Sequence, residues 1–166
     1  MASFVSSIRA DKNLENSGVW VRYTDKPNDD GTVPEFKIKR VSITNTAYQA
    51  KINPILKRIE NLNASKNDDN IISEVVSLNI ELIRVYLDEM LVDWRNVKDD
   101  VYDPKTGERV YDNDGRLMFE EIPYSKEMAR ELLANADAIN DAKWLMEQSG
   151  NISNFLTSNR KANLKH

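Results

Sequence analysis

The sequence predicts an α+β protein that is mainly helical. We expect an N-terminal antiparallel β-hairpin, then five or six helices, with a β-hairpin-like insertion near residues 98–121. Two short runs near the N-terminus alternate between apolar and polar residues, as half-buried strands do. Residues 71–94 are apolar on more than one helical face, which is typical of a central helix. Residues 98–121 are acidic and rich in turn formers.

The composition predicts one folded domain. The chain has 166 residues, of which 40% are hydrophobic, and it contains three Trp, six Tyr and four Phe. That is enough apolar material for one core of ordinary size. We therefore divide the chain into a flexible leader at 1–17, a single domain at 18–160 and a tail at 161–166.

Charge and residue types argue against several classes of function. The net charge of −4 disfavours nucleic-acid binding, which needs a concentrated basic face. The chain has no Cys, and its one histidine, His166, is the last residue, so thiolate and imidazole sites are not expected. No glycine-rich phosphate loop or nucleophile elbow occurs. We expect no enzyme activity and no cofactor. We also expect no signal peptide and no membrane span, because the apolar runs are short.

The N-terminal hairpin is expected at 18–43. Residues 19–23 and 36–41 are strand-like, and the segment between them carries Pro, Asn, Asp and Gly, which favour a turn. The alternation predicts that Trp20, Phe36 and Ile38 face the core.

Helices are expected at 45–97. Asn45 suits an N-cap, and Pro54 predicts a kink or a split into two short helices near Asn53. After a polar linker, Asp69 or Asn70 should cap the longest helix, at about 71–94.

The insertion at 98–121 is predicted to protrude. It holds two turn signals, at 103–107 and 112–115, each followed by a short strand-like run. We expect a β-hairpin or a pair of short strands, and the most mobile part of the chain.

Further helices are expected at 125–159. Ser125 is the predicted N-cap of a helix that reaches Asn135, and Asp137 is the predicted cap of the next helix. Gly150 suits a left-handed C-terminal cap, and Asn151 should start a last short helix.

The most specific candidate for a chemical site is a calcium-binding loop in the insertion. With Gly115 at the sixth position of an EF-hand loop, Asp112, Asp114 and Glu121 fall at ligand positions. The first position would be Val110, which cannot bind a metal, and the flanks resemble strands. A solvated hairpin turn is therefore the favoured reading. The aromatic residues of the hairpin and the two later tryptophans are likewise read as core residues, not as a ligand platform; these are Trp20, Tyr23, Phe36, Trp94 and Trp144.

An ordered set of short motifs resembles the tail assembly chaperones of long-tailed bacteriophages. The set begins with the strand at 18–23 and an Asn-x-Ala-Tyr helix start that contains Tyr48. It continues with a Trp-x-x-Val element at Trp94 and Val97, which ends a long helix in that family. A Pro-Tyr-Ser element, a Leu-Leu pair and an Asn-Phe pair follow, and their residues are Pro123, Tyr124, Ser125, Leu132, Leu133 and Phe155. The insertion at 98–121 departs from the family, whose members pass quickly between the Trp and Pro-Tyr-Ser elements.

The resemblance implies a non-enzymatic assembly factor. Such proteins bind the tape-measure protein and help to recruit tail-tube protein in the host cell cytoplasm, and they are absent from the mature virion. Homo-oligomerisation is possible. Two alternatives stay open: a structural phage component kept in the virion, such as a tail completion or connector protein, and a small calcium-binding module. We also predict that Trp94 and Val97 are buried against the helix that begins at Ser125.

Overall fold

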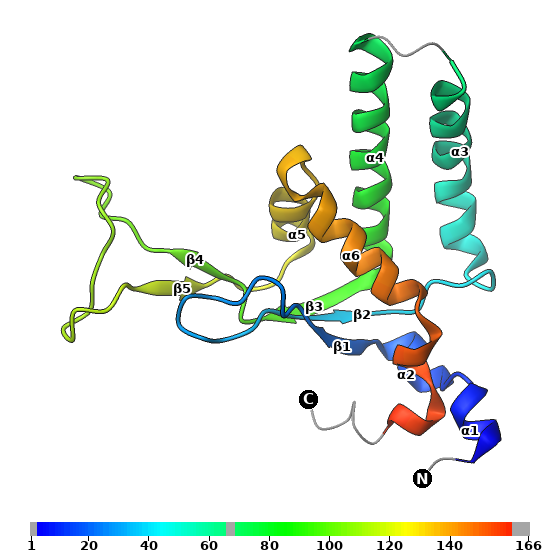
Figure 1. Ribbon diagram of the computed structural model, residues 1–166, viewed down its shortest axis with the longest axis horizontal. Coiled ribbons are helices and arrows are strands. Elements are labelled where there is room, and N and C mark those ends of the chain that lie inside the picture. Colours follow the sequence, from blue (N-terminus) through cyan, green and yellow to red (C-terminus); the bar gives the residue numbers. More distant parts are fainter. Residues whose placement is uncertain (1–2, 66–68, 161–166) are drawn as a thin grey trace.

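A computed structural model describes residues 3–65 and 69–160, and it confirms the predicted α+β fold (Figure 1). The predicted tail at 161–166 lies outside the described residues. The elements in chain order are α1 (Phe4–Ile8), α2 (Lys12–Ser17), β1 (Val19–Arg22), β2 (Glu35–Ile38), α3 (Thr46–Asn63), α4 (Asp69–Met90), β3 (Leu91–Arg95), β4 (Lys98–Asp100), β5 (Phe119–Glu121), α5 (Lys126–Leu133), the 3-10 helix η1 (Ala136–Ala138), α6 (Ile139–Gly150), and the 3-10 helices η2 (Ile152–Phe155) and η3 (Thr157–Asn159).

The N-terminal sheet has three strands, not the two of the predicted hairpin. β1 and β2 pair antiparallel as expected, and β3 adds to the far side of β2. The predicted long helix therefore ends at Met90, and the segment that contains Trp94 is a strand. The spacing of the apolar residues in this segment is compatible with a helix and with a strand. The segment is a strand because β2 offers it a free edge with which to pair. Lys39 N–H donates to Met90 O at 2.9 Å at the point where α4 ends and β3 begins.

The faces of the sheet correct one prediction. Phe36 and Ile38 face the core as expected, at 5% and 0% exposed. In β1, however, Val19 and Val21 are the buried residues, so Trp20 points to the opposite face, where it is only partly buried. The side chain of Arg95 covers Trp20, with Cζ 4.0 Å from the ring centroid. The alternation in β1 does not decide which residues face the core, because Val19 and Val21 on one face and Trp20 on the other are all apolar.

Helices α3 and α4 form an antiparallel pair that rises from one side of the sheet (Figure 1). α3 is one continuous helix with Pro54 inside it, so of the two predicted outcomes, a kink or a split near Asn53, the split was wrong. Asn45 is at the N-cap position, but its side chain accepts from Ser42 N and makes no cap bond. α4 begins at Asp69, so Asp69 and Asn70 lie within the helix instead of capping it.

The C-terminal helices start largely where expected. Ser125 caps α5, its Oγ accepting from Met128 N at 3.0 Å, and Asn151 caps η2. Asn135, not Asp137, caps the next helical segment. Gly150 is the last residue of α6 and does not have a positive φ, so the predicted left-handed cap was wrong.

The leader is folded onto the end of the domain. Asp11 caps α2 through bonds from Asn13 N and Leu14 N, and Leu14 is buried. Asp11 N–H also donates to Phe155 O at 2.7 Å, and Arg160 lies 3.6 Å from the Asp11 carboxylate. The predicted flexible leader is thus replaced by two short helices. This attachment joins Asp11 to Phe155 and Arg160, which are far away in the sequence, so no local pattern could indicate it.

Tyr86 and Ser149 form a buried polar pair in the core. Tyr86 of α4 is 0% exposed, and its hydroxyl donates to Leu145 O at 3.0 Å and lies 2.5 Å from Ser149 Oγ on α6. Burial raises the pKa of the Tyr86 phenol. The pair therefore fixes how α4 packs on α6, with its polar atoms satisfied inside the core.

We expect Tyr86→Phe to lower the free energy of unfolding by about 1–3 kcal/mol, because Ser149 keeps a buried hydroxyl without its phenol partner. Urea unfolding of Tyr86→Phe, Ser149→Ala and the double variant measures this. The double variant should lose less than the sum of the two single losses. Strict additivity would show that the two hydroxyls do not interact.

Candidate protein-binding surfaces

An aromatic cluster joins the two central motif elements. The Trp94 ring lies 5.3 Å from Tyr124 and 6.3 Å from Phe36 between centroids, both edge to face. Its indole N–H donates to Ile122 O at 2.7 Å. Val97 O accepts from Ile122 N at 2.8 Å. The contacts beside Trp94 thus involve the segment that leads into α5.

Trp94 is buried as predicted, but its contacts toward α5 are with Ile122 and Tyr124, which precede that helix, and Val97 is only half-buried. The Tyr124 hydroxyl donates to Leu91 O at 2.9 Å, and burial, with Asp93 nearby, raises the pKa of Tyr124. A buried aromatic group with satisfied polar atoms is a packing device, not an open binding face.

The other predicted site residues do not gather at one place. Tyr48 and Phe155 are buried at 3% and 0% exposed, and they belong to α3 and η2. The rest divide between partly buried positions and the surface: Trp20, Ser125, Leu132 and Leu133 are half-buried, and Pro123 is exposed. The predicted set therefore outlines the core instead of a site.

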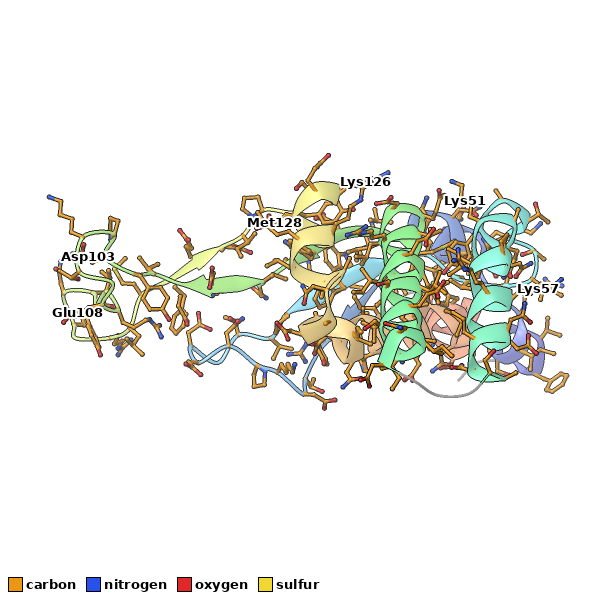
Figure 2. The ribbon with its side chains drawn as sticks, turned by 90° about the horizontal axis from the view of Figure 1, so that it is seen from above. Lys51, Lys57, Asp103, Glu108, Lys126 and Met128 are labelled. Carbon is orange, nitrogen blue, oxygen red and sulfur yellow. The ribbon has the colours of Figure 1, made fainter. Side chains whose placement is uncertain are left out.

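The insertion forms an arm that extends away from the helices, as predicted. We use "arm" for residues 98–121. β4 and β5 pair at its base, with Lys98 opposite Glu121. Beyond this ladder the arm divides into two small loops, one closed by a bridge between Tyr102 and Arg109 and the other by a bridge between Tyr111 and Leu117. Figure 2 shows the arm from above, with Asp103 and Glu108 at its far end and Met128 on α5. The turns are made by Gly107 and Gly115, both at positive φ.

The arm has a small internal core around Arg109. The guanidinium lies 5.5 Å from the Tyr102 ring and 5.4 Å from the Phe119 ring, and it pairs with Asp100 at 3.2 Å. These contacts all lie within the arm, and cation–π contacts of this kind stabilise it.

Large apolar side chains remain exposed along the arm. Tyr102, Tyr111 and Met118 are 53%, 60% and 40% exposed. Sequence reasoning identified the arm but not these residues as a contact surface. Aromatic residues within a charged, turn-rich stretch were the available signal, since such residues otherwise prefer the core.

A hollow of about 650 Å³ lies between the arm and the turn that joins β1 to β2. The turn contributes Asp29 and Asp30, and the arm contributes the remaining lining residues: Asp112, Arg116, Leu117, Met118 and Phe119. Lys98 at the base of the arm pairs with Asp30 at 2.5 Å. The Asn28 side chain also donates to Asn96 O at 2.8 Å. These contacts hold the turn beside the arm.

The acidic residues of the predicted calcium loop are used in other ways. Asp112 Oδ1 accepts from Asp114 N and Arg116 N, both at 2.9 Å, which closes a tight turn. Glu121 accepts from Asn96 N. The flanks are strand-like, not helical. Within residues 3–65 and 69–160, no group of three potential metal ligands gathers.

We expect Lys98→Met to raise the pKa of Asp30. Hydrogen bonds from Lys98 and then Thr32 lower the pKa of this carboxyl from 3.8 to about 2. A lowered folded-state pKa stabilises the fold above 3.8, and this contribution is lost as the pH falls through about 2. NMR titration of the Asp30 carboxyl in the variant should give a midpoint nearer 3.8. Lys126→Met, an exposed position on α5, is the control and should leave the midpoint unchanged. An ordinary Asp30 midpoint in the wild type would contradict the contact.

Comparisons of the chain with protein-family models, with curated proteins and with solved structures find no match. In the part of the chain that the structure describes, no helix is both long enough and apolar enough to cross a membrane. The candidate protein-binding surfaces are therefore supported by the geometry of the described residues alone.

Proposed function

We propose that this chain is a non-enzymatic tail assembly chaperone of a long-tailed bacteriophage. It binds the tape-measure protein and helps to recruit tail-tube protein in the host cell cytoplasm. The ordered motifs carry this proposal. In particular, the Trp element and the Pro-Tyr-Ser element, separated by the whole arm in sequence, are in contact through Trp94 and Tyr124.

The exposed apolar residues of the arm support a binding role. A long, aggregation-prone client presents extended segments with apolar side chains, and reversible contact with such segments needs exposed apolar groups on a well-solvated protein. Tyr102, Tyr111 and Met118 supply those groups. The net charge of −4 keeps the chaperone dispersed.

Co-expression with the tape-measure protein of the same phage tests the proposal. We expect the tape-measure protein to be soluble and to co-purify with this chain, and to aggregate when expressed alone. The double variant Tyr111→Ser, Met118→Ser keeps the contact between Arg109 and Tyr102, so it should fold as the wild type does but retain less client. A matched double variant, Ile43→Ser and Ile72→Ser, replaces exposed apolar side chains outside the arm and should retain the client fully. No co-purification of the wild type would refute the proposal.

Mass spectrometry of purified virions separates this proposal from the alternative of a structural component. A chaperone is absent from mature particles, whereas a tail completion or connector protein is present at a fixed ratio to the tube protein. Detection at such a ratio would replace the chaperone assignment.

A further inference from the structure

The two edges of the three-stranded sheet differ. Side chains close the edge at β3: Trp94 N–H donates to Asp93 Oδ1 at 2.8 Å, and Leu91 O accepts from the Tyr124 hydroxyl. Within residues 3–65 and 69–160, no side chain makes a comparable hydrogen bond to the edge at β1. An uncovered strand edge presents backbone donors and acceptors to any second strand.

The register shows which groups of β1 point outward. Tyr23 N–H donates to Pro34 O at 2.8 Å, so in an antiparallel ladder Val21 and Val19 also bond to β2. The N–H and C=O groups of Trp20 and Arg22 therefore point away from β2. Among the described residues, no hydrogen bond joins these four groups to another element.

This edge is complementary to itself. If two β1 strands run antiparallel about a two-fold axis at Val21, Trp20 of each copy lies opposite Arg22 of the other. Both are outward-pointing residues, so each pair can exchange two backbone hydrogen bonds. A two-fold contact uses the same surface on both copies, which this register satisfies.

The side chains fit the same register. Trp20 and Arg22 lie on the face opposite the core, so each indole would lie beside a guanidinium of the other copy, an attractive cross-strand pair. Like charges are not placed opposite each other. Arg95, which already covers Trp20, is neutralised by Glu35 at 2.8 Å. The helices α3 to α6 stand on the other side of the sheet (Figure 1).

We propose that two copies of this chain join through β1 and form one continuous sheet with three strands from each copy. The partner is a second copy because this edge is complementary to itself. The outward N–H groups of one copy can donate to the outward C=O groups of the other, and the Trp20 ring of one copy can contact the Arg22 guanidinium of the other. The inference does not depend on the assembly function proposed above.

Sedimentation of the wild type and two variants at position 22 tests the dimer. The wild type should sediment at twice 19.1 kDa. Arg22→Pro should be monomeric, because proline removes an outward N–H but spares the ladder with β2. Arg22→Ala keeps that N–H and should weaken the dimer less. A thermal melt should show all three folded. A monomeric wild type at every soluble concentration, or a dimeric and folded Arg22→Pro, would overturn the proposal.

Disulfide cross-linking tests the register. The chain has no Cys, so introduced thiols report without background. Directly opposed residues of a hydrogen-bonded antiparallel pair lie about 5.5 Å apart between Cα atoms, within reach of a disulfide. A mixture of Trp20→Cys and Arg22→Cys chains should cross-link on mild oxidation far more than either chain alone. Equal cross-linking in all three samples would rule out this register.

Discussion

Replacement of Trp94 by Ala should lower the free energy of unfolding by about 3–5 kcal/mol, as truncation of a large buried aromatic residue does. Trp94 is 5% exposed and contacts both Phe36 and Tyr124. Truncation of this side chain leaves a cavity where β2, β3 and the segment before α5 meet. It also leaves Ile122 O without the indole donor. Urea unfolding followed by circular dichroism measures the loss.

Trp20 provides the matched control, since it lies on the same sheet but on the opposite face and is only partly buried. Trp20→Ala should cost much less than Trp94→Ala. Trp94→Phe isolates the hydrogen bond from most of the packing and should cost an intermediate amount. Equal losses for Trp20→Ala and Trp94→Ala would mean that the cluster around Trp94 does not hold the core together.

Replacement of residues 99–120 by Asn-Gly should abolish client binding but leave the fold intact. Lys98 and Glu121 are direct partners at the base of the arm, so a two-residue turn can join them. The replacement removes the arm's own small core around Arg109 and retains the Lys98–Asp30 contact. Shorter connections at a surface change stability little. The thermal midpoint should therefore stay near that of the wild type, and client pull-down should fail.

A second replacement controls for the altered length. An arm of unchanged length with Tyr111 and Met118 as Ser should also lose client, because binding is assigned to exposed side chains of the arm and the contact between Arg109 and Tyr102 is kept. Unfolding of the shortened protein would show that the arm belongs to the core. Full client retention by the shortened protein would place the client on another surface.

Local sequence determined the elements whose physics is local. Ser125 starts α5 because its hydroxyl satisfies a free backbone N–H three residues on, and no distant residue is needed. The arm was predictable for the same reason, since Gly107 and Gly115 take the positive φ that tight turns require. The long amphipathic pattern likewise indicated α4. Burial of Trp94 was predicted from the order of the motifs.

Only the tertiary structure decided the elements that depend on distant partners. The segment that contains Trp94 could be helix or strand by its spacing, and it is a strand because β2 offers it a ladder. Trp20 could face either way, and it faces outward because Val19 and Val21 fill the core while Arg95 covers the ring. The exposed residues of the arm became a candidate surface only when their exposure was known. In each case the deciding energy comes from contacts across the chain, which a local pattern does not contain.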